Sequence, residues 1–183
     1  MNPHLDRVEM PLFFNGIFDI PRSPKDFEII PISQKRAAKL NKLWHSSMPQ
    51  FTNPNVCKPS FAAVYQGVYF AVAMWSYPIA ANRLKGGEKC LELRRFAISS
   101  DSPRNTATYM LSKMTKFIYD NYLHIERLIS YQDTQKHYGT IYKAANWKPM
   151  KKSKYISWGN HSRRPGKIEQ SKAPKIRWEY KIR

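Results

Sequence analysis

The sequence is poor in acidic residues, in cysteine and in long apolar stretches. Its 183 residues include 13 Asp and Glu against 31 Lys and Arg, which leaves a formal charge of +18 at pH 7. The two cysteines, Cys57 and Cys90, match no metal or redox spacing, so we expect reduced thiols. The most apolar stretch, residues 61–75, is too short to cross a bilayer, and the first residues lack the apolar block of a signal peptide. We therefore expect an intracellular protein that has no membrane partner.

The positive charge favours a polyanion as the partner, and nucleic acid is the polyanion that such a field most often binds. On charge alone, a ribosome-associated or merely basic protein is an equal alternative. Residues 148–183 hold 12 Lys and Arg but only two acids, Glu169 and Glu179. Basic residues neutralise phosphates, and aromatic side chains stack on bases. This stretch interleaves residues of both kinds, and its aromatic residues include Trp178 and Tyr180. The candidate nucleic-acid contacts are Lys151, Lys152, Lys154, Tyr155, Trp158, Arg163 and Arg164.

The hydrophobic periodicity predicts one α/β domain over residues 26–158, preceded by an extended, proline-rich lead-in (1–25) and followed by a basic C-terminal arm (159–183). Ser33 is the expected N-cap of a first helix that ends before Pro49. The longest amphipathic helix begins at Pro103 or Arg104, and a short helix follows within 139–147. The expected strands are residues 27–32, a hairpin over 61–75 that turns at Gln66-Gly67, 91–98, 128–133 and 154–158. The strand, helix and strand between 91 and 133 predict a parallel pair.

This order of elements, with a hairpin before the parallel pair, resembles the GNAT acyltransferase fold over residues 26–158. The resemblance implies a mixed central sheet flanked by helices, in which two parallel strands separate at their C-terminal ends. The acyl donor would lie in that gap, between residues 96–106 and 130–137. The GNAT pattern also expects glycines in the loop before the long helix, where backbone amides hold the pyrophosphate of coenzyme A. Neither glycine is present here, which counts against coenzyme A and leaves Arg104, Asn105, Thr106 and Arg94 as candidate ligands of another anionic donor.

Three stretches, LRRFAI, NTATYML and YQDTQKHYGTIYKAANW, resemble more specifically the phage Mom family of DNA-modifying proteins. The resemblance implies that the exocyclic amine of adenine in DNA becomes a carbamoylmethyl (glycinamide) derivative, which protects phage DNA from restriction in the cytoplasm of the bacterial host. Iron and acetyl-coenzyme A have both been proposed for this family. Because that amine is paired inside a duplex, the base must be flipped or single-stranded. Tyr65, Tyr69 and Trp75 of the hairpin are candidate walls for it.

Tyr131 and Asp133 lie two residues apart at the end of a strand, so their side chains share one face of the sheet. Asp133 could accept a proton from the adenine amine or bind a metal, and its alternative role is to cap the following turn. Tyr131 could stack on the base or stabilise a developing negative charge. The GNAT resemblance implies that Tyr142 is the general acid at the leaving group, although ordinary core packing explains it nearly as well.

Arg94 and Arg95 follow one another in a strand, so we expect one on each face of the sheet. We favour Arg95 as the residue that grips a phosphate or the donor. The alternative is a structural ion pair with Glu92 or Glu126.

His45 ends the first helix and is either a surface residue stabilised by the helix dipole or a catalytic residue. With Asp133 and His137 or Tyr142 it could also form an N/O ligand set for iron, if these side chains converge.

The glycinamide product limits the choice of donor, because the methyl carbon of an acetyl group is not an electrophile. A metal and radical route is one solution. The other is an activated glycyl group, such as glycyl-tRNA, whose carbonyl the adenine amine attacks before the product rearranges. Transfer RNA would then be a second polyanionic partner. Two rival functions stay open, a conventional acetyl-coenzyme A acyltransferase and a non-catalytic nucleic-acid-binding protein. The oligomeric state cannot be predicted from the sequence.

Overall fold

A mixed seven-stranded sheet forms the centre of the protein. The computed structural model describes residues 20–48, 50, 53, 56, 58–78, 89–152 and 173–183, without the side chains of 151 and 152. The strands follow the order β1-β2-β3-β4-β5-β7-β6. The expected α/β fold is confirmed. The strands are β1 (Glu28–Pro31), β2 (Ser60–Tyr65), β3 (Val68–Ser76), β4 (Cys90–Ile98), β5 (Arg127–Asp133), β6 (Lys148–Lys152) and β7 (Lys175–Lys181).

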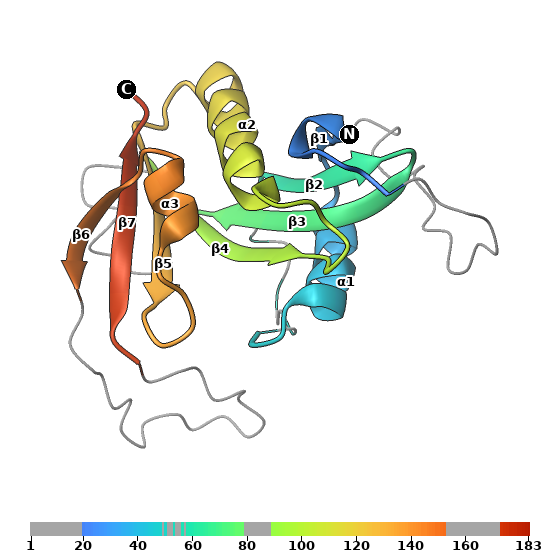
Figure 1. Ribbon diagram of the computed structural model, residues 1–183. Helices are drawn as coiled ribbons and strands as arrows, with labels where there is room; N and C mark the ends of the chain where they lie inside the picture. The colour runs from blue at the N-terminus through green and yellow to red at the C-terminus, as the bar shows by residue number, and fades with distance from the viewer. Residues whose placement is uncertain are drawn as a thin grey trace.

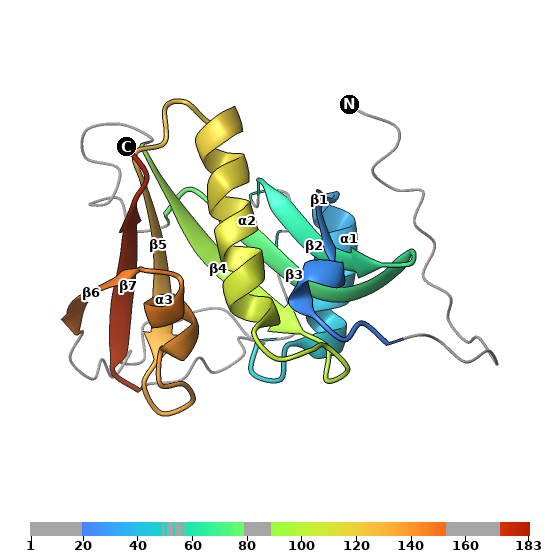
Figure 2. The same ribbon diagram turned by 45° about the horizontal axis from the view of Figure 1, so that its top comes forward.

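The helices cover the two faces of this sheet unequally (Figures 1 and 2). On one face α1 (Gln34–Trp44) packs against β2, β3 and β4. On the other face lie α2 (Thr106–Asn121) and the short α3 (Thr140–Ala144). Alternate residues of β2 enter the two cores, because successive side chains of a strand point to opposite faces. Ala62 packs with α1, whereas Phe61 and Ala63 pack in the larger core with α2.

Local sequence signals explain the first elements. The side chain of Ser33 accepts a hydrogen bond from the backbone amide of Arg36 at 3.3 Å, so it caps α1 as expected. Gln66 and Gly67 have φ values of 47° and 78°, which is the left-handed backbone that a two-residue hairpin turn requires. The predicted hairpin is therefore confirmed.

The parallel pair β4 and β5 separates halfway along its length. Their pairing runs from Cys90 opposite Arg127 to Leu93 opposite Ser130 and ends there. Beyond this point β4 continues with β3 as far as Ile98, and β5 continues with β7 as far as Asp133. Each strand thus follows its outer neighbour, and the two diverge toward the lower end of Figure 1. The parallel pair is confirmed, and so is the expected gap.

A bulge lies at the point of separation. Trp75 of β3 is opposite Leu93, but the next residue along β3, Met74, is opposite Arg95. Arg94 is therefore an extra residue in β4, and a bulge of this kind bends its strand and increases the local twist. The bend turns β4 away from β5 immediately after their last shared pair.

The C-terminal strand β7 was not predicted. Residues 175–181 were expected in a basic arm outside the domain, but they pair with β5 and β6 inside the sheet. Ile176, Trp178 and Tyr180 join the larger core, with Trp178 buried. Their alternation with charged residues is typical of a strand that is apolar on one face. This part of the chain is thus structural.

Several expectations fall on other parts of the chain. The expected strand at 154–158 and Cys57 lie outside the described residues, as do residues 1–19 of the lead-in. A 3-10 turn, η1 (Pro24–Asp26), occupies the end of that lead-in and precedes β1. Cys90 is a buried free thiol. Of the helices that the structure describes, none has the length and apolar character needed to cross a membrane.

We predict that Gly139→Ala destabilises the protein strongly. Gly139 has a φ of 71°, and a Cβ there would lie 2.5 Å from Gln132 Oε1 and 2.6 Å from Trp178 Cζ2. Gly67→Ala is the matched control, since its φ is 78° and nothing lies within 4 Å of its Cβ position. Both variants carry the strain of a left-handed backbone, roughly 1–2 kcal/mol. Overpacking should cost Gly139→Ala about 1–3 kcal/mol more in the free energy of unfolding, measured with urea. Equal losses would contradict this packing argument.

Candidate active site

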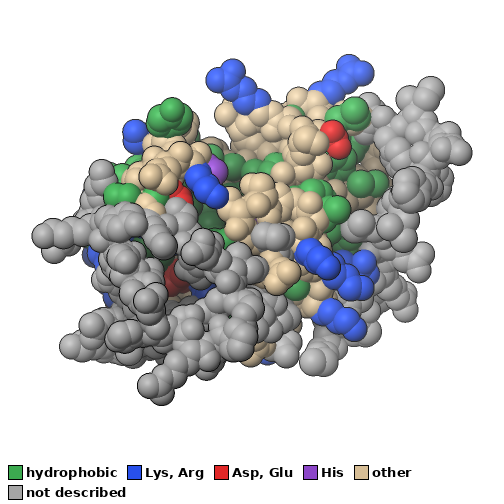
Figure 3. All heavy atoms as spheres, turned by 90° about the horizontal axis from the view of Figure 1, so that it is seen from below, with side chains coloured by type: hydrophobic (Ala, Val, Ile, Leu, Met, Phe, Trp, Pro, Cys, Tyr) green, Lys and Arg blue, Asp and Glu red, His purple; other side chains and the backbone are tan. Residues whose placement is uncertain are grey.

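A pocket of about 700 Å³ occupies the gap between β4 and β5. Its walls come from the C-terminal end of α1, the second half of β4, the end of β5, the loop that follows it and α3. Figure 3 views the molecule from this end, where Lys, Arg and a His side chain are visible and acidic side chains are few. The separation of the two strands thus creates this cavity.

The lining of this pocket is cationic. Arg94, Arg95, Lys136 and Lys175 contribute to it, and Asp133 is the single carboxylate among its described lining residues. A concave site lined by one sign of charge concentrates ligands of the opposite sign. The pocket is therefore suited to an anionic substrate.

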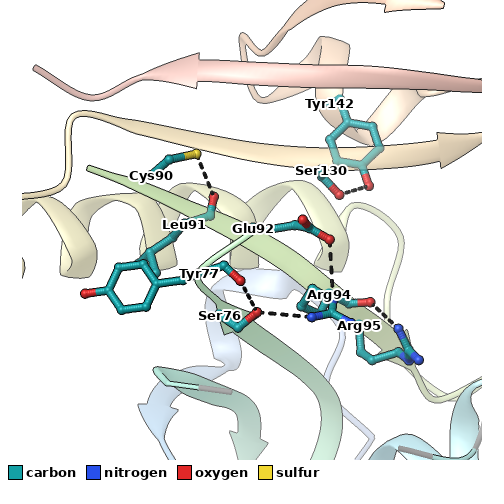
Figure 4. Close-up of polar contacts among 9 residues, drawn as sticks. All are labelled: Ser76, Tyr77, Cys90, Leu91, Glu92, Arg94, Arg95, Ser130 and Tyr142. Carbon is teal, nitrogen blue, oxygen red and sulfur yellow. Dashed lines mark hydrogen bonds and ion pairs between the residues drawn. The ribbon is translucent and has the colours of Figure 1, made fainter. Parts of the chain in front are cut away.

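Tyr142 and Ser130 form a buried hydroxyl pair in this pocket. Tyr142 Oη lies 2.8 Å from Ser130 Oγ, and either oxygen can be the donor. Figure 4 shows Tyr142 descending from α3 toward Ser130 on β5. Ser130 is also the last residue of β5 that pairs with β4. The pair therefore lies at the inner end of the gap, and sequence reasoning missed Ser130 because one Ser in a strand follows no recognisable pattern.

The environment of Tyr142 keeps its hydroxyl protonated. Burial raises the pKa of Tyr142 above its ordinary value of 10.0, and the hydrogen bond with Ser130 opposes this only in part. A phenol with a raised pKa is neutral at physiological pH, so it can donate a proton but cannot serve as a resting base.

The ring of Tyr142 is held by aromatic neighbours. It stacks on Trp178 with ring centroids 5.4 Å apart, and Trp147 lies at 5.7 Å in a tilted arrangement. The indole of Trp178 donates to Gln132 Oε1 at 2.7 Å, and Gln132 Nε2 donates in turn to the carbonyl of His137. This chain of contacts fixes the loop after β5 to the C-terminal strand. The suggestion that Trp178 stacks on a base is wrong, because its ring is buried against Tyr142.

Asp133 and Tyr131 line the same pocket from the opposite face of β5. Tyr131 is partly exposed. Asp133 Oδ1 accepts a hydrogen bond from the amide of Gln135 at 3.0 Å, so one carboxylate oxygen caps the following turn. The capping role that the sequence left open is therefore present. Because β4 no longer covers this edge of β5, the pocket reaches residues on both of its faces.

Arg94 and Arg95 both line the pocket, and they do not occupy opposite faces as expected, because Leu93 before them and Phe96 after them both pack in the larger core. The bulge at Arg94 interrupts the alternation on which that expectation depended. The guanidinium of Arg94 lies 3.4 Å from Glu92, and it also donates to Ser76 Oγ (Figure 4). Arg94 thus forms the structural ion pair with Glu92. Arg95 donates to the carbonyl of Arg94 at 2.8 Å.

His45 is the C-cap of α1 and lines the pocket. Its Nδ1 accepts hydrogen bonds from the amides of Ser47, at 3.3 Å, and Met48, at 3.1 Å. Lys136 Nζ donates to Ser47 Oγ at 2.7 Å, which joins this turn to the loop after β5. Burial, followed by the charges of Arg95, His137 and Lys136, lowers the pKa of His45 below its ordinary value of 6.5. Its partners therefore favour a neutral ring.

The suggested iron ligands His45, Asp133 and His137 do not form a metal site. No group of three His, Cys, Asp or Glu side chains suited to a metal exists among the described residues. Nδ1 of His45 is also used by two backbone amides. The residues present do not fit an iron centre, so we assign no step to iron.

The loop before α2 has a backbone that its sequence did not suggest. Asn105 has a φ of 70°, a left-handed conformation that Asn adopts more readily than other non-glycine residues. The side chain of Thr106 is buried, and its hydroxyl donates to the carbonyl of Pro103 at 2.7 Å. Arg104 and Asn105 are exposed. Arg104, Asn105 and Thr106 are absent from the pocket lining, whereas Ala107, which follows them in α2, is part of it. The missing glycine does not prevent a left-handed turn, because Asn105 adopts that backbone.

The remaining candidates lie elsewhere. Tyr65, Tyr69 and Trp75 are absent from the pocket lining, and the buried Trp75 donates to Met114 Sδ at 3.3 Å in the core. Lys151 and Lys152 belong to the edge strand β6. The other suggested nucleic-acid contacts lie outside the described residues, and they are Lys154, Tyr155, Trp158, Arg163 and Arg164.

Comparison with known proteins agrees with this geometry. The model of the Mom protein family matches residues 26–175. The chain belongs to the Mom protein family. No curated protein matches it.

Solved structures similar to this Mom family chain are GNAT acetyltransferases, and at these low identities they show the fold alone. A protein from Salmonella typhimurium, described as an acetyltransferase and solved with its cofactor acetyl-CoA, has a TM-score of 0.60 at 8% identity over 86% of this chain and 95% of its own. A GNAT family acetyltransferase from Streptococcus pneumoniae has a TM-score of 0.60 at 9% identity over 85% and 99%. An N-acetyltransferase from Staphylococcus aureus has 0.59 at 10% over 86% and 99%. The expected fold family is thus confirmed.

We predict that His45 makes the protein less stable in mild acid. Its pKa in the folded state lies below 6.5, so the unfolded chain binds the proton first and folded stability falls as the pH drops below 6.5. The loss ends below the folded pKa. In His45→Gln this contribution is absent, so urea unfolding should show wild type losing more stability than the variant between neutral pH and mild acid. The carboxylates also titrate in this range, but they are the same in wild type and in His45→Gln, so their effect cancels in the comparison. Parallel curves of stability against pH for the two proteins would contradict the lowered pKa of His45.

Proposed function

We propose that this Mom family chain modifies DNA by transferring a glycyl group to the exocyclic amine of adenine and rearranging it to the carbamoylmethyl derivative. Such a product would protect phage DNA from host restriction. The partner would be DNA with the target base flipped out or unpaired, and the donor would be an activated glycyl ester such as glycyl-tRNA. The setting would be the cytoplasm of a bacterial host.

The observation that carries this proposal is the buried, protonated hydroxyl of Tyr142 at the inner end of the gap between β4 and β5. Its partner Ser130 lies at 2.8 Å, and both line a pocket of about 700 Å³. An acyl transfer is assisted by an acid that gives a proton to the leaving group, and the protonated hydroxyl of Tyr142 supports the assignment of that role to it.

The first step would be an ordinary acyl transfer. The amine nitrogen of adenine attacks the glycyl carbonyl carbon, and the bond from that carbon to the ribose oxygen of the donor breaks. Tyr142 protonates the departing ribose oxygen, and Ser130 supports its hydroxyl. Asp133, on the opposite face of β5, would accept the proton that the amine loses. Acid and base therefore approach the reacting atoms from two sides of one strand edge.

The second step would be an isomerisation with no further reactant. The free amine of the attached glycyl group attacks the ring carbon that carries the modified nitrogen. The original bond between ring carbon and nitrogen breaks, and that nitrogen becomes the terminal amide. The product is a glycinamide attached through its amine, with the same atoms as the first adduct.

The cationic lining supports a pair of polyanionic substrates. Arg94, Arg95, Lys136 and Lys175 surround the pocket, and the whole chain carries +18. Phosphate contacts of this kind supply affinity that falls steeply with salt. DNA and an aminoacylated RNA would both be attracted to this end of the molecule.

A conventional acetyl-coenzyme A transferase is the second candidate. It is favoured by the left-handed backbone of Asn105 and by Ala107 at the pocket wall, which leave the loop before α2 shaped for an anion at a helix N-terminus. Binding of coenzyme A that depends on Asn105 would support it.

We predict that Tyr142→Phe abolishes most of the modification while the protein stays folded. Phe keeps the stacking on Trp178 but cannot donate a proton, so the rate should fall about 10²- to 10⁴-fold. The assay is mass spectrometry of nucleosides from the DNA of bacteria that express the protein. Tyr119→Phe, at an exposed tyrosine of α2, is the matched control and should keep full activity.

Two other results of this assay would reject the proposal. An unmodified deoxyadenosine pool beside a soluble, DNA-binding wild type would leave a non-catalytic nucleic-acid-binding protein. Full activity in Tyr142→Phe would remove the assigned acid.

We also predict where the original adenine nitrogen ends in the product. With a heavy-isotope exocyclic amine in the DNA and glycyl-tRNA as the donor, the label should appear in the terminal amide and leave as ammonia when that amide is hydrolysed. Mass spectrometry of the hydrolysed nucleoside reads this directly. Retention of the label on the nitrogen bonded to the ring would exclude the rearrangement, and a product made from acetyl-coenzyme A would exclude the glycyl donor.

A further inference from the structure

The imidazole of His45 is fixed in one tautomer by the backbone that follows α1. Two amides, those of Ser47 and Met48, donate to Nδ1 at 3.3 and 3.1 Å. A ring nitrogen that accepts hydrogen bonds holds a lone pair and no proton. In the neutral ring the proton therefore resides on Nε2.

The charges around His45 keep this tautomer neutral. Arg95 approaches from β4, and Lys136 and His137 approach from the loop after β5. Burial and these three side chains all oppose a second proton on the imidazole and so lower its pKa. The hydrogen bond with the backbone of His45 itself acts in the opposite direction. Lys136 is in addition fixed to Ser47, next to the two amides, by its 2.7 Å hydrogen bond.

These contacts limit what His45 can do. With Nδ1 occupied and a proton on Nε2, neither nitrogen offers a lone pair to a metal or to a substrate proton. Nε2–H is instead a hydrogen-bond donor. The two amides occupy Nδ1 and the side chain of His45 lines the pocket, so Nε2–H can donate to a ligand that binds there.

The position of His45 indicates which substrate it meets. His45 ends α1, which packs on one face of the sheet, whereas Tyr142 enters the pocket from α3 on the other face. Figures 1 and 2 show these two helices in opposite layers. If Tyr142 serves the leaving group, the opposite wall must face the nucleophile. The nucleophile in the proposed function is the amine of a nucleobase.

We infer that His45 is a base-recognition residue that donates from Nε2 to the adenine ring nitrogen N1, next to the reacting amine. This inference rests on the proposed function for the identity of the base. Enzymes that act on a flipped base read its Watson–Crick edge, and adenine presents there an acceptor at N1 beside its amine. Guanine carries a hydrogen on N1 and would place a donor against the His45 donor. A neutral imidazole held by the backbone therefore discriminates between the two purines.

The first test is nuclear magnetic resonance of the full chain, with heavy-isotope nitrogen in its histidines, near neutral pH. The nitrogen shifts of His45 should show the Nε2–H tautomer, and adding deoxyadenosine monophosphate should move the Nε2 resonance. The analogue 1-deaza-deoxyadenosine monophosphate lacks the acceptor and should bind roughly tenfold more weakly, as expected when one buried donor loses its partner. The 7-deaza analogue keeps N1 and is the matched control.

Variants of His45 separate hydrogen bonding from packing. In His45→Leu the preference for adenine over the 1-deaza analogue should disappear, whereas His45→Gln, whose amide can donate, should recover part of it. Circular dichroism checks that both variants are folded. An Nδ1–H tautomer, a protonated ring, or equal binding of the two nucleotides by wild type would overturn the inference. These readouts do not require turnover, so DNA that stays unmodified would reject the proposed function while the tautomer and the nucleotide preference decide the role of His45.

Discussion

The buried indole of Trp178 is the contact on which the candidate site depends. It stacks on Tyr142, donates to Gln132 and lies where a side chain on Gly139 would clash. The register of β7 places it opposite Ser130, so one residue positions both members of the hydroxyl pair. Large aromatic side chains contribute much buried area and little conformational freedom, which makes them effective anchors. Tyr142 therefore owes its position to a strand distant from it in the sequence.

The separation of β4 and β5 gives the site its two-sided character. Successive side chains of a strand inside a sheet point to opposite faces, which the sheet keeps apart. The end of β5, however, no longer pairs with β4 on one edge. Ser130 and Asp133 lie on opposite faces of this strand, yet both reach one pocket. The bulge at Arg94 has the same effect on β4, where it brings two consecutive arginines to the cavity. Irregularity in the sheet thus gathers charges that a regular sheet would keep apart.

The sequence predicted the fold where the signals are local. Ser33, Gln66-Gly67 and the periodicity of α2 each depend on a few neighbouring residues, and each was interpreted correctly. The alternation of Ile176, Trp178 and Tyr180 was also available, but the many lysines and arginines around it led to its assignment as a basic arm. The bulge at Arg94 and the pairing of Ser130 with Tyr142 could not have been found, because each is a contact between two separate elements that no run of neighbouring residues specifies. The iron ligand set failed for a similar reason, since the backbone amides that occupy His45 have no sequence signature.

The pairing of β5 with β7 has a consequence for the folding pathway. Gln132 and Trp178 are 46 residues apart along the chain, whereas the turn between β2 and β3 needs only two. Closing a long loop costs entropy before its contacts repay it, so distant pairings of this kind form slowly. The hairpin of β2 and β3 can form from short-range contacts, and β4 can pair with β3, while β7 is still undocked. The chain would then pass through a partly folded intermediate in which Trp178 does not yet hold Tyr142 in the pocket. The candidate site would therefore be the last part of the protein to form.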